Sequence, residues 1–165
     1  MHQQIVEDLI LEAKERVWIA TANLKDMHIK GRSGRGYVPI LDEFDRMVRD
    51  RGVSFRIIHA DKMSDSFKNT LMEYSLLQKH LEIQVCPRSH WKMVLVDGKS
   101  AYFGSANFTG AGLGIKNVDR RNLELGALLK DRESILQLET WFDSFWIGDN
   151  CIKCERRKYC PEPIV

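Results

Sequence analysis

Short runs of β-forming residues alternate with longer amphipathic stretches along this 165-residue chain. The β-type runs cover residues 17–22, 53–58, 81–85, 91–96, 99–104 and 122–129, and the helix-type stretches cover 4–16, 38–51, 64–80 and 133–146. Strands that alternate with helices, with one hairpin among them, are typical of a sheet covered by helices. We therefore expect an α/β sandwich in which a mixed β-sheet is flanked by helices on both faces.

The length of the chain bounds its domain organisation. A chain of this size builds one hydrophobic core and is too short for two. The helix-type and strand-type patterns end near residue 148, and three of the four cysteines follow. We expect one folded domain over residues 1–148 and a cysteine-rich C-terminal tail over residues 149–165.

The composition is that of an ordinary soluble globular protein, with 44% hydrophobic and 29% charged residues. A net charge of +2 means that any binding of nucleic acid has to come from a local basic surface. The longest apolar runs, such as 17–20, are far shorter than the roughly 18 residues of a membrane span, so we expect no membrane insertion. Residues 1–8 carry no basic-then-apolar stretch, so we expect no signal peptide and a cytoplasmic location with reduced thiols.

One predicted hairpin gathers the side chains that can carry chemistry. Asp97-Gly98 is the dipeptide that best indicates a two-residue turn between the runs 91–96 and 99–104. With that turn, Lys92 lies opposite Phe103 and His90 opposite Ser105, so His90, Lys92, Ser105 and Asn107 share one face. An imidazole can attack phosphorus or transfer a proton, and an ammonium, an amide and a hydroxyl can bind phosphate oxygens.

These residues resemble the signature of the phospholipase D superfamily, H-x-K-x4-D-x6-G-S-x-N. The run from His90 through Lys92 and Asp97 to Gly104-Ser105-Ala106-Asn107 matches every defined position, and Asn122-Leu123-Glu124-Leu125 is similar to the family's continuation. The resemblance implies a phosphodiesterase in which His90 forms a phosphohistidine and Lys92 and Asn107 bind the non-bridging oxygens. Ser105 would assist them, and Glu124 would accept a hydrogen bond from the other nitrogen of the His90 imidazole. Asp97 falls in the turn, off this face, and we interpret it as structural.

A single copy of the motif predicts a dimer. The reaction needs a nucleophile and a proton donor for the leaving group, and one chain offers one such histidine. The short bacterial members of the family resemble this chain and pair two copies, so we expect a homodimer with two His90 side chains at a shared active site. The resemblance also implies that catalysis needs no divalent cation and no other cofactor.

A basic, glycine-rich loop is a candidate for substrate binding. Lys30, Arg32 and Arg35 lie among glycines in residues 30–36. These side chains either clamp a phosphate backbone or belong to an ordinary solvated loop, and the sequence does not choose between the two. The other histidines, including His59, lack a comparable pattern and are expected at the surface or at strand ends.

The cysteines are the second feature that stands out. Cys151, Cys154 and Cys160 have a C-x2-C-x5-C spacing, and Cys86 is the only other cysteine and could be a fourth ligand. Four thiolates can hold a structural zinc ion or an iron–sulfur cluster, and we expect zinc before iron–sulfur. The alternative is a tail with three reduced thiols or one incidental disulfide.

The motif specifies the type of bond that is cut but does not specify the substrate molecule that contains it. The leading hypothesis is an endonuclease of low sequence specificity, acting on DNA or RNA. The first alternative is a phospholipase or another lipid phosphodiesterase. The second is a non-catalytic nucleic-acid-binding module, although the histidine and lysine that such a module would have lost are both present.

Overall fold

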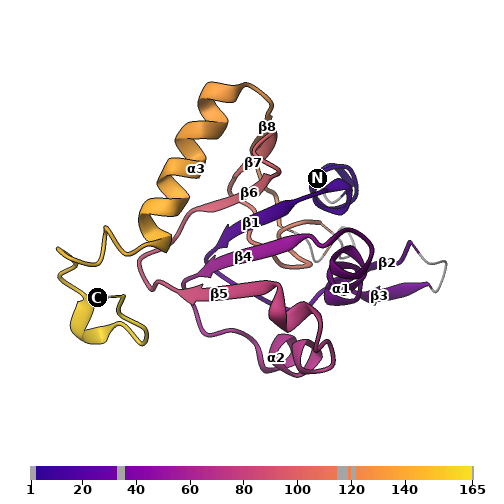
Figure 1. Cartoon of the computed structure of the whole chain (residues 1–165), viewed down its shortest axis with the longest axis horizontal. Coiled ribbons are helices and arrows are strands. Elements are labelled where there is room, and N and C mark those ends of the chain that lie inside the picture. The colour runs from indigo at the N-terminus through magenta and orange to yellow at the C-terminus, as the bar shows by residue number, and fades with distance from the viewer. Residues whose placement is uncertain (1–2, 33–35, 115–118, 120–121, 165) are drawn as a thin grey trace.

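The centre of the molecule is a six-stranded sheet with the strand order β5-β4-β1-β6-β7-β8 (Figure 1). The computed structural model describes residues 3–32, 36–114, 119 and 122–164. The strands are β1 (Arg16–Thr21), β4 (Ser54–His59), β5 (Leu81–Val85), β6 (Lys92–Val96), β7 (Ser100–Gly104) and β8 (Gly126–Leu129). The first three are parallel, whereas β6, β7 and β8 each run antiparallel to a neighbour. The sheet is therefore mixed, as the sequence predicts.

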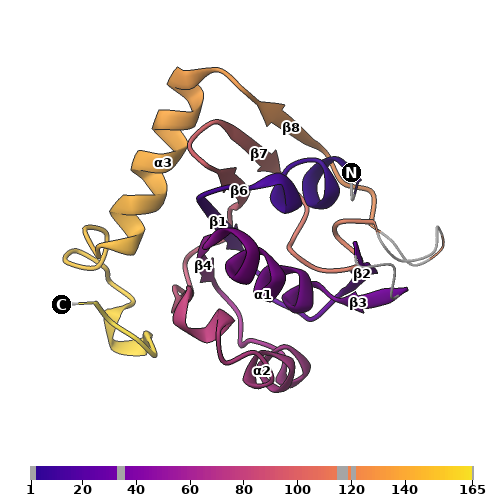
Figure 2. The ribbon, with the colours of Figure 1, turned by 45° about the vertical axis from the view of Figure 1, so that its right-hand side comes forward.

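Helices cover both faces of this sheet, which confirms the predicted fold class. One face carries α1 (Ile40–Arg51), α2 (Asp65–Met72) and the short turns η1 (Gln3–Glu7), η2 (Ile10–Glu12) and η3 (Leu77–Lys79). The other face is covered by α3 (Arg132–Trp146), which lies across the sheet from α1 in Figure 2. The alternation within β1 explains the two layers, since Val17 and Ile19 enter one core and Trp18 and Ala20 the other.

Two predicted helices are shorter than their patterns. The 4–16 stretch divides into η1 and η2, and the 64–80 stretch ends as a helix at Met72. Ser64 caps α2 as predicted, because its side chain accepts from the Phe67 amide at 3.2 Å. Farther along, the amide of Leu77 donates to Asp45 Oδ1 of α1 at 3.2 Å. This contact with another element competes with a continuous helix, and no local pattern could have shown it.

The hairpin between β6 and β7 differs from its predicted register by one residue. Val96 pairs with Ser100, so Asp97, Gly98 and Lys99 form a three-residue loop. Asp97 and Gly98 have φ values of 54° and 64°, and the Lys99 amide donates to the Val96 carbonyl at 2.9 Å. Consequently Lys92 pairs with Gly104 and not with Phe103.

The remaining elements are peripheral. Two short strands, β2 (His28–Lys30) and β3 (Tyr37–Pro39), form a separate two-stranded sheet. After α3 the chain continues as a series of turns that includes η5 (Arg157–Tyr159), drawn in yellow in Figure 1. Within the described residues, no helix combines the length and apolar character needed to cross a membrane.

Candidate active site

The motif residues meet at one end of the sheet because of the strand directions. β6 is antiparallel to β1, with Ala20 paired to Met93, so the start of β6 lies beside the end of β1. Lys92 at the start of β6 pairs with Gly104 at the end of β7, and Gly104 pairs with Gly126 at the start of β8. The residues that flank these strand ends therefore lie at the same end of the sheet, although they are far apart in the sequence.

His90 and Lys92 form the centre of this site. The Lys92 ammonium donates to the His90 carbonyl oxygen at 2.7 Å and lies 3.1 Å from His90 Nδ1. His90 is exposed, whereas Lys92 is only 7% exposed. Burial lowers the pKa of Lys92, and the negative charge of Glu124 opposes this shift. The structure thus places a buried cation against an accessible imidazole.

Glu124 and Ser105 bind one another beside this pair. The Ser105 hydroxyl donates to the Glu124 carboxylate, and the Asn122 amide donates to its other oxygen at 3.0 Å. The Ser105 hydroxyl also accepts from the Leu125 amide at 3.0 Å, so the 122–125 segment is tied to the end of β7. The predicted hydrogen bond from His90 to Glu124 is absent among the described residues, and Glu124 acts on Lys92 through its charge instead.

Asn107 is held through its side-chain oxygen. Oδ1 accepts from the backbone amides of Ala22 at 3.0 Å and Asn23 at 3.3 Å, both just after β1. These bonds use the oxygen of the amide and leave the two N–H donors of Nδ2 out of the contact with the end of β1. Ser105 and Asn107 reach the site from the segment that follows β7, which ends at Gly104, and not from the predicted strand register.

Thr21 is a residue that the sequence reasoning missed. It is fully buried, and its hydroxyl accepts from the Phe108 amide at 2.9 Å and donates to the Asn23 carbonyl at 2.9 Å. It therefore joins the end of β1 to the segment that carries Asn107. The only signal in the sequence is a threonine in the last position of an apolar strand.

Asp97 lies at the other end of β6, as predicted. Its carboxylate accepts from the backbone amides of Lys14 at 2.8 Å and of Glu15 and Arg16 at 2.9 Å each. These three bonds fasten the hairpin loop to the segment that enters β1. Asp97 is a structural residue of the motif.

Two glycines of the site are required by the ring of Tyr102. A Cβ atom on Gly126 would lie 2.3 Å from Tyr102 Cε2, and one on Gly104 would lie 2.4 Å from the Tyr102 hydroxyl oxygen. The hydroxyl accepts from the Ala106 amide at 3.3 Å. The glycine of the motif therefore makes room for a ring that supports the Ser105–Asn107 segment.

Comparison with known proteins identifies the family. Residues 6–146 match the family model described as "Cardiolipin synthase, PLD-like domain". The chain belongs to the phospholipase D-like family. No curated protein matches the sequence of the chain.

Solved structures share the phospholipase D-like fold at low sequence identity. NucT from Helicobacter pylori is 18% identical with a TM-score of 0.60, over 88% of this chain and 89% of NucT. Nuc from Salmonella typhimurium, a phospholipase D family member, is 14% identical with a TM-score of 0.58, over 87% of this chain and 86% of Nuc. The archaeal chromatin protein TrmBL2 is 16% identical with a TM-score of 0.58, over 88% of this chain and 48% of TrmBL2. The chain thus has the fold of the superfamily's phosphodiesterases.

The described residues of the basic loop contact the segment before β1. Arg32 forms an ion pair with Glu12 at 2.6 Å and donates to the Glu7 carbonyl at 3.1 Å, both in the segment before β1. Lys30 is exposed at the end of β2, and no hydrogen bond or ion pair between described residues links Lys30 or Arg32 to His90. Arg35 lies outside the described residues. Arg32 is thus engaged with the segment before β1 in this structure, and the phosphate clamp by Lys30, Arg32 and Arg35 stays a prediction.

His59 is buried and was expected at a strand end or at the surface. It ends β4, pairs with Thr21 in the sheet and is 2% exposed. Nδ1 lies 2.6 Å from the Asp61 carbonyl, whereas Nε2 is buried without a hydrogen-bond partner among the described residues. Burial lowers the pKa of His59, and hydrogen bonding to Asp61 opposes this shift. The strand-end position was predicted correctly, and the burial was not.

All four cysteines line a single hollow between the end of β5 and the C-terminal tail. It lies apart from the motif residues, although the segment from Cys86 runs directly into His90.

Proposed function

We propose that this chain hydrolyses phosphodiester bonds in nucleic acid, as a homodimer, through a covalent intermediate on His90 and without a catalytic metal ion. The observation that carries the proposal is the Lys92 ammonium, 3.1 Å from His90 Nδ1 and buried beneath an exposed imidazole. Such a pair can neutralise a phosphate oxygen while a ring nitrogen reaches phosphorus.

The reaction would proceed in two displacements. A nitrogen of one His90 attacks phosphorus, the bond from phosphorus to the leaving oxygen breaks, and the second copy of His90 donates a proton to that oxygen. Water then attacks phosphorus, the same second imidazole accepts its proton, and the phosphorus–nitrogen bond breaks to free the first imidazole. Lys92 and Asn107 Nδ2 would bind the non-bridging oxygens in both steps, so no divalent cation is needed to offset their charge.

A symmetric dimer supplies the second histidine. The edge strand β8 and the segment before it carry exposed apolar side chains next to Glu124: Leu123, Leu125 and Leu128 are 101%, 83% and 46% exposed. A group of exposed apolar side chains is typical of a surface that a partner covers, and this one lies beside a site that has only one of the two histidines the reaction needs. A second copy of the chain on this surface would bring two His90 side chains together.

Nucleic acid is the substrate that we favour. The short, single-motif members that this chain resembles are the nucleases of the superfamily, and TrmBL2, which shares the fold, is described by its mode of DNA binding. The described residues offer no membrane-spanning helix that would hold the site at a bilayer. The proposed enzyme is an endonuclease with little sequence preference.

The test is one assay panel in EDTA. Labelled single-stranded DNA, double-stranded DNA, RNA and vesicles of anionic phospholipid are offered to the wild type and to His90→Ala at matched concentrations. We expect cleavage of a nucleic acid, a loss of about 10⁴-fold or more in His90→Ala, and a steep decline of substrate binding with salt. Light scattering of the same sample should give the mass of a dimer.

Each arm of the panel can overturn a different part of the proposal. Hydrolysis of the vesicles alone would replace the nuclease with a lipid phosphodiesterase. Activity that EDTA abolishes in a still-folded protein would remove the metal-free mechanism. A monomer with full activity would remove the shared site, and binding of DNA without turnover would make the chain a binding module.

A further inference from the structure

The C-terminal tail adopts a defined backbone conformation but has no hydrophobic core of its own. Residues 149–164 include no buried side chain, yet they form successive tight turns. Cys154, Arg157 and Cys160 each donate a backbone hydrogen bond three residues back, at 3.1–3.2 Å. A short segment that cannot bury apolar surface usually needs a cross-link or a metal ion to hold such a conformation.

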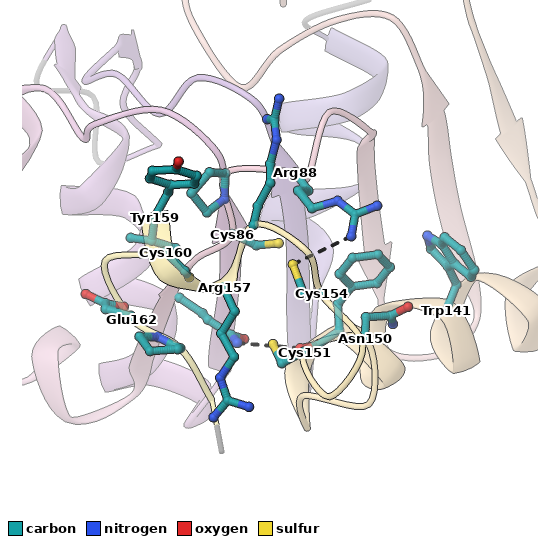
Figure 3. Close-up of a pocket in the computed structure, with 16 residues that line it drawn as sticks. Cys86, Arg88, Trp141, Asn150, Cys151, Cys154, Arg157, Tyr159, Cys160 and Glu162 are labelled. Carbon is teal, nitrogen blue, oxygen red and sulfur yellow. Dashed lines mark hydrogen bonds between the residues drawn. The ribbon is translucent and has the colours of Figure 1, made fainter.

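The cysteines of this tail are less exposed than the residues between them. Cys151, Cys154 and Cys160 are half-buried, whereas residues 152, 153 and 155–159 between them are all exposed. Cys86, at the end of β5, faces them from the sheet, and all four thiols line one hollow of about 510 Å³ (Figure 3). The fourth cysteine, 65 residues upstream of Cys151, is thus delivered by the tertiary structure.

A guanidinium lies against one of these thiols. Arg88 Nη1 donates a hydrogen bond to the Cys154 sulfur at 3.6 Å. A positive charge beside a cysteine stabilises the thiolate that a metal ion binds. Arg88 therefore stands where it can support an ion held by the cysteines of this hollow.

We propose that Cys86, Cys151, Cys154 and Cys160 bind one zinc ion that fastens the C-terminal tail to the end of β5. Four thiols would release four protons and give a tetrahedral site with a net charge of −2. Arg88, Arg156 and Arg157 line the same hollow and offset this charge. Zinc suits a closed site with four sulfur ligands, and the proposed hydrolysis transfers no electron that would call for an iron–sulfur cluster.

Binding would draw the sulfurs together. Among the described residues, no group of three or more His, Cys, Asp or Glu side chains is placed to hold a metal ion as the chain stands. The tail would therefore have to move so that the four sulfurs converge on the zinc ion. The hollow that the four cysteines line leaves room for this movement. The ion would also fix the segment from Cys86 to Ser89, which leads into His90.

The experiment is metal analysis of the whole chain after dialysis against metal-free buffer. We expect about one zinc per chain, because a structural site takes four protein ligands to one ion. The double variant Cys154→Ser/Cys160→Ser should lose the zinc, whereas Ile152→Ser, which changes an exposed residue of the same turn, should retain it. Arg88→Gln keeps all four ligands and should weaken zinc binding by about 10–100-fold, as expected for a group that supports a ligand.

A second measurement covers the case in which the cysteine variants do not fold. In the native wild type the four thiols should resist a thiol reagent until a chelator removes the zinc, after which all four react. Iron with acid-labile sulfide would overturn the assignment of zinc. A metal-free protein with four reactive thiols, or zinc that survives in the double variant, would overturn the site. None of these outcomes depends on phosphodiesterase activity, so they are distinct from a failure of the proposed function.

Discussion

Thr21 Oγ1 lies 3.3 Å from Asn107 Oδ1, where the end of β1 meets the segment that follows β7. The same hydroxyl accepts from the Phe108 amide, so Thr21 sets the position of the backbone that directly follows Asn107, the residue with the proposed phosphate-binding amide. The site depends on this contact as well as on the residues of the motif.

Replacing Thr21 by valine should therefore reduce activity without unfolding the protein. Valine keeps the shape of threonine but leaves the buried Phe108 amide without an acceptor, which costs about 1–3 kcal/mol. We expect kcat to fall by about 10-fold or more, with Thr21→Ser restoring most of it. Phosphodiester cleavage and thermal unfolding of the three proteins check this. Equal losses in the valine and serine variants would show that the hydroxyl does not position Asn107.

Asp97 should matter for stability and not for chemistry. Asp97→Ala removes the acceptor of three backbone amides and places alanine at a φ of 54°, so we expect a loss of about 2–4 kcal/mol in the free energy of unfolding. Asp97→Asn should lose less, because asparagine keeps an acceptor and tolerates a positive φ. Urea unfolding measures both. If cleavage per folded molecule fell as steeply as in His90→Ala, the structural role would be refuted.

His59 should make the protein less stable in weak acid. Its pKa in the folded state is lowered, so as pH falls below about 6.5 the unfolded chain takes up the proton first. Stability from this group is complete above about pH 6.5 and declines toward the folded pKa, by at most about 1.4 kcal/mol per pH unit. Urea unfolding between pH 7.5 and 5.0 should show a flatter dependence in His59→Gln. Parallel curves for the two proteins would contradict the assignment.

Glu124 should control the pH range of activity through Lys92. Its charge raises the pKa of Lys92, so Glu124→Gln should lower that pKa further and move the alkaline decline of kcat/KM to lower pH. Ser105→Ala removes a hydrogen bond to the carboxylate while keeping its charge, and should leave the alkaline decline in place. The pH profiles of both variants give the comparison. A shift in Ser105→Ala alone would assign the effect to the hydrogen bond.

The local sequence was informative wherever neighbours along the chain decide the outcome. The run 81–85 predicted β5 at its observed bounds, and Ser64 predicted the start of α2. The Asp97-Gly98 dipeptide predicted the hairpin of β6 and β7, although its register differs by one residue. The helix expected to reach residue 80 was wrong, since Asp45 of another helix binds the Leu77 amide.

What the sequence by itself determined is the alternation of strands and helices, the family motif and the set of groups able to handle a phosphodiester. Tertiary structure alone decided that Thr21 supports Asn107, that Glu124 binds Ser105 and not His90, and that Arg32 turns to Glu12. It also brought Cys86 to the tail cysteines. The physical reason is that side-chain types and periodicity determine which secondary structure each segment can form. The hydrogen-bond partner of a polar group is determined only when packing has brought donor and acceptor within about 3 Å of one another.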